Sequence, residues 1–304
     1  MNIGIIGLGL MGGSMGLELC SLRHLNPKDD GHTQPDGQQN FSIHKVLGVA
    51  RRQQTCEQAM AMGAVDEASV DLALMARADL VILCTPLAAM LPTWEQLKPY
   101  LDPATIVTDI GSVKKPIVDA LTPLWSNFIG AHPMAGTAAQ GIEAAHRGLY
   151  QGRPFVITPI ATTPPLAVAA VEQLAHWLGA IVYRCRPEDH DRAVAWISHL
   201  PVMVSASLVA ACRGETDPNV VRLAQQLASS GFRDTSRVGG GNPELGVMMA
   251  QYNQDALLRS LSIYRDQLEQ MITLIEQENW PGLTQVLRQT QIDRPRFVQP
   301  PSPL

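Results

Sequence analysis

Several patterns that define large protein classes are missing from this sequence. Its five cysteines are odd in number and share no disulfide spacing, so we expect small buried side chains in a reducing cytosol, and hence a cytoplasmic protein. No HExxH sequence or paired-cysteine spacing predicts a metal site. No block of lysine and arginine occurs, and the formal net charge of −5 argues against nucleic-acid binding. No uninterrupted apolar run reaches the roughly 18 residues of a membrane span, so we expect no membrane-spanning segment.

What is present suffices for a large globular core. The chain has 304 residues, of which 46% are hydrophobic and 17% are charged, as in soluble globular proteins. This length accommodates one large domain or two ordinary ones. We find no internal repeat.

The first residues contain a glycine pattern that directly follows an apolar run. Ile3 to Ile6 is β-prone and leads into Gly7-x-Gly9-x-x-Gly12 and a helix-like segment, the order that a dinucleotide-binding fingerprint requires. The first glycine permits the tight turn, the second lets the backbone approach a pyrophosphate, and the third lets helix pack on strand. The pyrophosphate is bound by N–H groups at the helix start. We therefore expect a dinucleotide at Gly7, Gly9, Leu10, Met11 and Gly12; a glycine-rich loop without a ligand is the alternative.

The residues after the second predicted strand indicate which dinucleotide is bound. That strand, 45–49, follows a polar, aperiodic stretch at 24–44 that we interpret as a mobile surface insertion without a function. A site for NAD usually carries Asp or Glu after this strand, to hold the ribose 2′-hydroxyl. Here the residues are Ala50, Arg51 and Arg52, and guanidinium groups suit a 2′-phosphate. The sequence thus predicts NADP, with two solvated arginines at a strand end as the alternative.

Apolar runs alternate with helical segments as far as residue 186. Runs at 79–85, 104–110, 127–131, 154–159 and 180–184 predict strands, and helices are expected at 86–100 and 164–178. The alternation predicts an α/β domain over 1–186 with a Rossmann-type, doubly wound sheet. Ligands bind at the carboxyl ends of the strands of such a sheet. Thr85 and Pro86 occupy such a position and are expected to contact the cofactor.

No strand is predicted after Pro187, so residues 187–293 are expected to form an all-helical domain. A long apolar helix at 193–212 contains Pro201, which predicts a kink. A helix that is apolar on most sides in a soluble protein is a core or interface element, which indicates a homodimer. Further helices are predicted at 218–229, 243–278 and 281–289, and the proline-rich residues 294–304 are expected to be disordered.

His132 is the candidate general base. It directly follows a predicted strand, at the edge of the sheet where the nicotinamide is expected, and Pro133 restricts its backbone. Histidine is a base near neutral pH without large tuning. Ser112, after the neighbouring strand, is expected to orient substrate or cofactor. Lys114 comes from the same segment, and the only role we predict for it is to cap a helix.

Two histidines and a glycine-rich cluster lie beyond residue 186. His190, flanked by two aspartates, is interpreted as part of a solvated helix start, whereas His199, beside Pro201, is a candidate to face the cleft. Residues 231–244 combine three consecutive glycines with arginines. They form either a close-fitting loop that holds an anion or a flexible helix connection with solvated arginines.

Five motifs of this sequence occur together in a fixed order. They are GLGLMGGS at 7–14, Asp109-x-x-Ser112-Val113-Lys114, HPMAG at 132–136, SHLP at 198–201 and FRDTSR at 232–237. On these motifs the sequence resembles the prephenate/arogenate dehydrogenase family of tyrosine biosynthesis, and within it the cyanobacterial arogenate dehydrogenases. The resemblance covers nearly everything from Asn2 to about Asp293 except the insertion. It implies a dinucleotide domain followed by an all-helical dimerisation domain.

The resemblance also implies an activity, the NADP-dependent oxidative decarboxylation of L-arogenate to L-tyrosine. By similarity, His132 accepts a hydrogen bond from the C4 hydroxyl of the substrate ring and withdraws its proton while hydride leaves C4 for the nicotinamide. The resulting ketone loses the ring carboxylate as CO2, because aromatisation favours that loss, and no metal is needed. Ser112 helps to place the hydroxyl and the nicotinamide. His199 and Arg237 hold the substrate, with Arg237 as the carboxylate partner.

One departure from the family pattern bears on the substrate. Prephenate-using members often carry an acid two residues after the glycine of the HPMAG motif, where this sequence has Ala138. Arogenate bears an ammonium where prephenate has a keto group, and an unpaired buried charge is costly. Asp234 and Glu244 flank Arg237 and are the candidate carboxylates, with Glu244 preferred. Prephenate dehydrogenation to 4-hydroxyphenylpyruvate is the alternative activity.

Two other functions are compatible with the same fold class. A β-hydroxyacid dehydrogenase shares the two-domain plan but uses a lysine from the long helix of the second domain, and this chain has no lysine after Lys115. A non-catalytic NADP sensor is compatible with the fold because function lies in the site. The sensor predicts no turnover, and no effect of His132→Asn except on stability.

Overall fold

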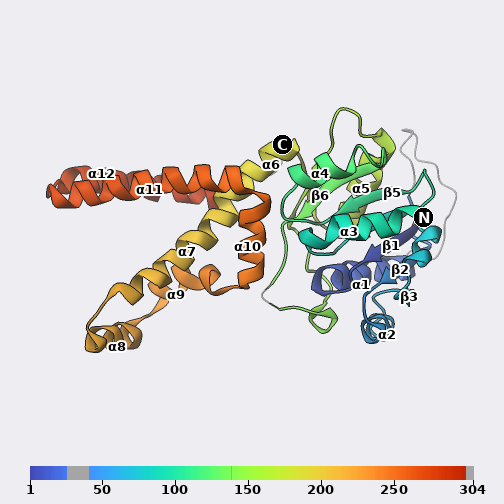
Figure 1. The fold of residues 1–304 in the computed structure, drawn as a ribbon, viewed down its shortest axis with the longest axis horizontal. Coiled ribbons are helices and arrows are strands. Elements are labelled where there is room, and N and C mark those ends of the chain that lie inside the picture. Colours follow the sequence, from blue (N-terminus) through green and yellow to red (C-terminus); the bar gives the residue numbers. More distant parts are fainter. Residues whose placement is uncertain (26–40, 138, 299–304) are drawn as a thin grey trace. The chain divides into compact units, whose positions relative to one another are not determined.

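The computed structural model describes residues 1–25, 41–137 and 139–298. The chain forms two compact units: one comprises Met1–Ala193 with Gly241–Tyr252, and the other comprises Val194–Gly240 with the described residues from Asn253 onward (Figure 1). Most of the predicted insertion, Ala138 and the end of the predicted tail lie outside the described residues. The predicted domain limits, 1–186 and 187–293, follow from the last strand signal and stay a prediction.

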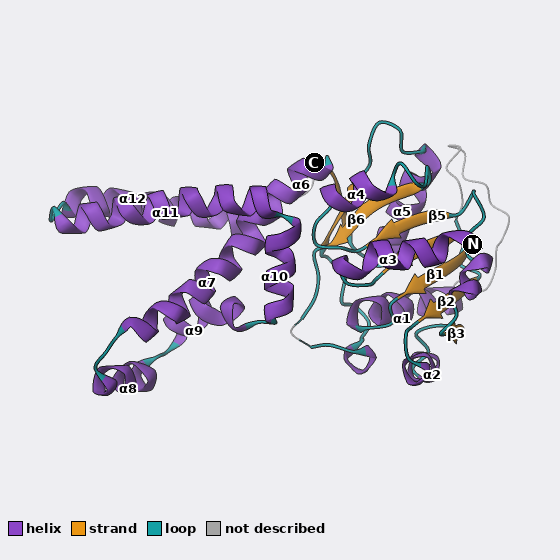
Figure 2. Ribbon diagram, viewed as in Figure 1, coloured by secondary structure: helices purple, strands orange, loops and turns teal. Residues whose placement is uncertain are grey.

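The first unit is built on one eight-stranded sheet with the order β3-β2-β1-β4-β5-β6-β7-β8 (Figure 2). Neighbouring strands are parallel except β6 and β7, which are antiparallel. The strands are β1 (Asn2–Ile6), β2 (Lys45–Val49), β3 (Glu67–Ser69), β4 (Leu80–Leu83), β5 (Ile106–Asp109), β6 (Phe128–Pro133), β7 (Pro154–Thr158) and β8 (Ile181–Arg184). The predicted α/β fold class is confirmed.

Helices pack on both faces of this sheet, which explains why a central strand such as β4 is apolar throughout rather than alternating. Side chains of α1 and α5 belong to one buried cluster, and side chains of α3 and α4 belong to another. All four residues of β4 are fully buried. The helices of this unit are α1 (Leu10–Leu25), α2 (Gln53–Ala61), α3 (Leu87–Leu97), α4 (Lys115–Leu121), α5 (Pro165–Trp177), α6 (Pro187–Val194) and α10 (Pro243–Tyr252), with short turns η1 (Leu72–Arg77), η2 (Lys98–Tyr100) and η3 (Ile142–Ala144).

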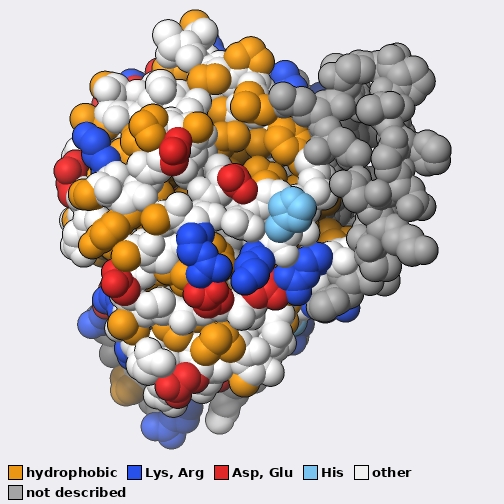
Figure 3. Space-filling view, turned by 90° about the vertical axis from the view of Figure 1, so that its right-hand side faces the viewer, with side chains coloured by type: hydrophobic (Ala, Val, Ile, Leu, Met, Phe, Trp, Pro, Cys, Tyr) orange, Lys and Arg blue, Asp and Glu red, His pale blue; other side chains and the backbone are white. Residues whose placement is uncertain are grey.

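Strand β3 was not predicted from the sequence. It has three residues, only partly buried, and pairs with β2 alone, so it carries no continuous apolar run. On the face of this unit drawn in Figure 3, Lys and Arg side chains lie next to Asp and Glu side chains, so this face has no uniformly basic patch.

The second unit is helical, as predicted. It contains the π-helical turn η4 (Ala195–His199), α7 (Leu200–Ala211), η5 (Cys212–Gly214), α8 (Pro218–Leu227), α9 (Ser230–Ser236), η6 (Arg237–Gly240), α11 (Gln254–Glu276) and α12 (Trp280–Val298). The single helix predicted at 243–278 is wrong: the chain leaves helical geometry at Asn253, whose φ is −128° and ψ 38°. Helix α12 extends to Val298, whereas the sequence predicted disorder from residue 294.

Among the described residues, one helical stretch, Pro187–Gly214, is long and apolar enough to cross a membrane by length and composition. Only 28% of its most apolar 18-residue window is buried. The sequence prediction counted uninterrupted apolar residues and therefore missed this stretch, in which polar residues are interspersed. Core and interface helices of soluble proteins have the same composition.

Candidate active site

The glycine motif forms a tight turn between β1 and α1. Gly7 has φ +103°, and a Cβ there would lie 2.7 Å from the Cys84 carbonyl oxygen, so only glycine fits. A Cβ on Gly12 would lie 2.2 Å from the Gly7 carbonyl oxygen, which explains the third glycine. At Gly9 a Cβ would meet no heavy atom within 4 Å, so space is open there beside the start of a 16-residue helix. The buried Tyr150 hydroxyl supports this helix start by donating to the Met11 carbonyl oxygen at 2.7 Å.

Thr85 follows β4 and lies next to this turn. Its backbone nitrogen is 3.2 Å from the position that a Cβ on Gly7 would take. Within the described part of the chain, its buried hydroxyl oxygen Oγ1 has no hydrogen-bond partner. Buried polar atoms are nearly always paired, so this hydroxyl fits a role in binding a ligand. The open space at Gly9 and this hydroxyl both fit a dinucleotide.

Arg51 and Arg52 follow β2 and are exposed, whereas Ala50 is buried. The Ala50 nitrogen donates to the Ser69 carbonyl oxygen at 3.2 Å, which joins this strand end to β3. With the residues that the structure describes, neither guanidinium forms an ion pair.

The predicted cofactor and catalytic residues lie along one edge of the sheet. β2, β1, β4, β5 and β6 are consecutive and parallel, so their carboxyl ends share this edge. These ends carry, in the order of the strands, Ala50, Gly7, Thr85, Ser112 and His132. Ser112 is half-buried in the segment between β5 and α4. The fold thus brings together residues that are up to 125 positions apart.

His132, at the end of β6, contacts His190, for which the sequence had predicted a solvated position. Its Nδ1 lies 2.9 Å from Nε2 of His190, and Nδ1 of His190 lies 2.7 Å from Oδ1 of Asp191. His190 is 3% exposed and Asp191 is 5% exposed, so the predicted solvated helix start is wrong. The charged first turn of α6 resembled a solvated helix start, and the buried face appears only when α6 packs beside β6 and α4. In the sequence, only the adjacency of His190 and Asp191 indicated that these two residues could be paired.

Asp191 also caps helix α4 from a distance. Its Oδ1 accepts from the Lys114 backbone nitrogen at 2.7 Å, and its Oδ2 accepts from the Lys115 backbone nitrogen at 2.8 Å. The Lys114 side chain does not cap this helix, contrary to the role considered for it. The first turn of a helix has unpaired N–H groups, and a carboxylate is well suited to pair with them.

The Lys114 side chain is instead fully buried in an ion pair with Asp109. Its Nζ also donates to the Ala131 carbonyl oxygen at 2.7 Å, and the Ala131 nitrogen donates to Asp109 Oδ1 at 3.1 Å. Burial lowers the pKa of Lys114, and the carboxylates of Asp109 and then Asp191 oppose this effect. The pair therefore holds the residue that precedes His132 through both of its backbone polar groups.

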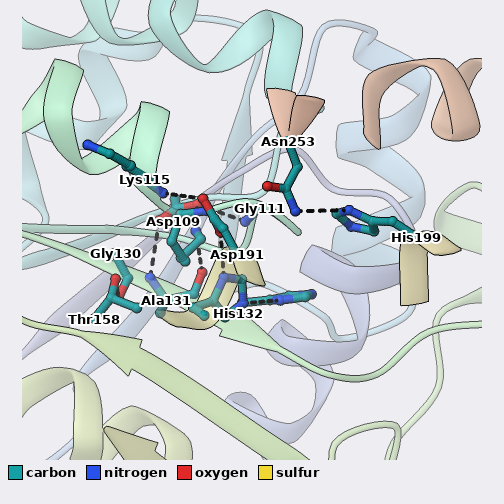
Figure 4. Close-up of polar contacts among 12 residues, drawn as sticks. Asp109, Gly111, Lys115, Gly130, Ala131, His132, Thr158, Asp191, His199 and Asn253 are labelled. Atoms are coloured by element: carbon teal, nitrogen blue, oxygen red, sulfur yellow. Dashed lines mark hydrogen bonds and ion pairs between the residues drawn. The ribbon is translucent and has the colours of Figure 1, made fainter. Parts of the chain in front are cut away.

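In the second unit, His199 is fully buried at the end of the π-helical turn η4. The Asn253 amide lies 3.1 Å from its Nδ1 (Figure 4). Pro201 stands in the first turn of α7, directly after η4. Because proline lacks an N–H group, it removes one helical hydrogen bond, and the wider π-helical turn directly precedes it; the predicted kink stays a prediction.

Residues 231–240 are helical, whereas the sequence predicted a loop or flexible connection. A Cβ on Gly239 would lie 2.4 Å from the Ala206 nitrogen, so this glycine permits close packing on α7. Ser205 of α7 also donates to the Thr235 carbonyl oxygen. Gly239 allows η6 to pack closely against α7, so the glycines of this segment wrongly predicted a loop.

The three charged substrate candidates are exposed. Arg237 begins η6, and Asp234 in α9 pairs with Arg233 at 3.4 Å. Glu244 lies in the first turn of α10, in the first unit, and its nitrogen donates to Asn242 Oδ1 at 2.9 Å.

Two domain families together match most of the chain. Residues 38–184 match "Prephenate dehydrogenase, nucleotide-binding domain", and residues 186–289 match "Prephenate dehydrogenase, dimerization domain". The fold and the glycine turn thus define a Rossmann-type nucleotide-binding protein with a helical dimerisation domain. The chain belongs to the prephenate dehydrogenase family and is a dehydrogenase.

Known relatives span nearly the whole chain. The crystal structure of Synechocystis arogenate dehydrogenase is 51% identical, with a TM-score of 0.84, and covers 98% of this chain and 100% of that one. Prephenate dehydrogenase from Aquifex aeolicus, in complex with hydroxyphenyl propionate and NAD+, is 27% identical, with a TM-score of 0.85 and 98% coverage of both chains. Cyclohexadienyl dehydrogenase of Zymomonas mobilis is 31% identical over 70% of this chain and 73% of its own length.

Proposed function

We propose that the protein converts L-arogenate to L-tyrosine by oxidative decarboxylation with NADP+. The observation that carries the proposal is the position of His132, at the strand edge beside Ser112 and in line with the glycine turn. The 51% identity to an arogenate dehydrogenase supports this substrate. Prephenate dehydrogenation to 4-hydroxyphenylpyruvate is the second candidate, because a relative binds hydroxyphenyl propionate.

His132 acts as the general base of this reaction. When bound, the nicotinamide supplies a hydride acceptor for C4 of the substrate. His132 accepts the hydrogen bond of the C4 hydroxyl and takes its proton, and Ser112 orients that hydroxyl. The ketone formed at C4 loses the ring carboxylate as CO2, because the product ring becomes aromatic. Gly7, Gly9, Leu10, Met11 and Gly12 bind the pyrophosphate through the turn and the helix start, and Thr85 and Pro86 line the adjoining wall.

We propose that His199 and Arg237 hold the substrate, Arg237 by pairing with a carboxylate. A carboxylate must then receive the ammonium of arogenate. Glu244 is preferred because it forms no ion pair among the described residues, whereas Asp234 already pairs with Arg233. Replacing Glu244 by Gln should lower kcat/KM for arogenate about tenfold or more and leave that for prephenate within about threefold. Asp234→Asn is the matched control, and an unchanged substrate ratio in Glu244→Gln would exclude this role.

We propose that Arg51 and Arg52 select NADP through its 2′-phosphate. Hydrogen bonds to charged groups contribute about 1.5–3 kcal/mol, so Arg51→Ala with Arg52→Ala should raise KM for NADP+ at least about tenfold. KM for NAD+ should change little, because it lacks that phosphate. Arg184→Ala, on the edge strand at the other end of the sheet, is the control. Equal changes of both KM values would contradict the assignment.

The proposed enzyme is a cytoplasmic homodimer joined through its C-terminal helices. Helices α11 and α12 expose large apolar side chains that one chain leaves uncovered, among them Ile263, Leu268, Ile272, Ile275, Leu287 and Ile292. The match to a dimerization domain supports this use of the surface. Light scattering that gave the 33.0 kDa mass of one chain would contradict it.

The proposed activity is tested by initial rates with arogenate and prephenate, each with NADP+ and NAD+. Turnover confined to arogenate and NADP+ would support the full proposal. Equal use of prephenate would contradict the ammonium argument but keep the reaction class. Absence of turnover with all four combinations would favour a non-catalytic NADP-binding protein.

A further inference from the structure

We propose that His190 and Asp191 are positioning residues that set the protonation state of His132. In this proposal, Asp191 holds the proton of neutral His190 on Nδ1, and His190 holds the proton of neutral His132 on Nδ1. The Nε2 atom of His132 then carries the ring lone pair and is the basic nitrogen. The inference rests on the proposed role of His132 as base.

The direction of the hydrogen bonds follows from the chemistry of the partners. An ionised carboxylate only accepts, so the 2.7 Å contact to Asp191 Oδ1 requires a proton on His190 Nδ1. A neutral imidazole carries one N–H, so His190 Nε2 is then an acceptor. The 2.9 Å contact to that nitrogen therefore requires a proton on Nδ1 of His132. With His190 neutral, as the proposal has it, these two contacts leave one arrangement of protons.

Asp191, the last residue of this hydrogen-bonded chain, is held as an ionised acceptor by its cap on helix α4. Asp191 accepts from the Lys114 and Lys115 backbone nitrogens as well as from His190, so three donors face its two oxygens. If the Asp191 carboxyl were protonated, its O–H donor would face one of these N–H donors. His190 and Asp191 are both at least 95% buried, so water does not substitute for a lost contact. An unmatched pair of donors in such a place is costly.

The same chain stabilises the cation that forms during catalysis. When His132 takes the substrate proton on Nε2, its ring becomes an imidazolium whose Nδ1–H still donates to His190. The Asp191 carboxylate at the end of the chain offsets this positive charge, as the aspartate of a Ser-His-Asp triad does for its histidine. The other charged or titratable groups nearby are Asp109 and Lys114, which pair with each other, and the Cys185 thiol, whose pKa is raised by burial and by Asp189 and Asp191.

Two variants and two matched controls test the kinetic consequence. His190→Phe should lower kcat about 100-fold with little change in KM, because the base loses its preferred tautomer. Asp191→Asn should lower kcat about tenfold and move the acid limb of the kcat/KM profile to lower pH, because the imidazolium loses its counter-charge. Asp189→Asn removes a neighbouring carboxylate that is only partly buried, and His176→Phe removes an exposed histidine; both should behave as wild type. A kcat for His190→Phe within about threefold of wild type would overturn the proposal.

A measurement without substrate or cofactor separates this inference from the proposed function. Long-range 15N–1H spectra of histidine-labelled protein report which ring nitrogen carries the proton, and the His132 signal is assigned by its loss in His132→Asn. We expect the Nδ1–H form in wild type and a shift towards Nε2–H in His190→Phe. The Nε2–H form in wild type would overturn the inference, even if the variants of Asp191 fail to fold. The Nδ1–H form in a protein without turnover would support the inference and contradict the proposed function alone.

Discussion

Replacement of His132 by Asn is expected to lower kcat by about 10²–10⁴-fold, the usual contribution of a general base. The loss should fall on kcat and leave the Kd of the dinucleotide unchanged, because the glycine turn belongs to β1 and α1 whereas His132 belongs to β6. Steady-state rates give kcat, and a fluorescence titration gives the Kd.

His146→Asn is the matched control for this experiment. His146 is exposed in the same unit, and its Nδ1 lies 3.1 Å from the Ala144 carbonyl oxygen. We expect wild-type kcat in this variant. If His132→Asn also kept its kcat, another residue would have to be the base. If it changed stability alone, in a chain without turnover, the non-catalytic alternative would be favoured.

Replacement of Lys114 by Met is expected to cost about 3–5 kcal/mol of unfolding free energy, because it leaves the Asp109 carboxylate buried without a counter-charge. The Ala131 carbonyl oxygen loses its contact to Nζ as well. Denaturant unfolding, followed by circular dichroism, measures the change.

Two further variants make this expectation specific. Lys115→Met should cost less than about 1 kcal/mol, because the Lys115 side chain is 47% exposed and its ion pairs with Asp119 and Glu188 are solvated. Combining Lys114→Met with Asp109→Asn should recover part of the loss, since no buried charge remains and the amide oxygen can still accept from the Ala131 nitrogen. Equal losses of unfolding free energy in Lys114→Met and Lys115→Met would show that the buried ion pair contributes no more to stability than the exposed one.

Local patterns in the sequence determined the fold class and the edge of the sheet where the site lies. Continuous apolar runs predict buried parallel strands, and β4 is such a strand, buried at every residue. Glycine spacing predicted the turn at Gly7, because the positive φ that requires glycine there is a property of the local backbone. The positions of Ser112 and His132 followed, because each comes directly after a strand. These properties depend on neighbours in the sequence.

Only the tertiary structure decided which polar groups are buried and how they are paired. Asp191 contacts the Lys114 nitrogen across 77 residues, and His190 contacts His132 across 58. No local pattern distinguishes such a carboxylate from the solvated acids beside it, since burial depends on which helix packs against it. Gly239 is a similar case, because its purpose is contact with α7. The sequence by itself therefore indicated the candidate base, His132, and the packing of α6 against β6 and α4 decided which groups surround it.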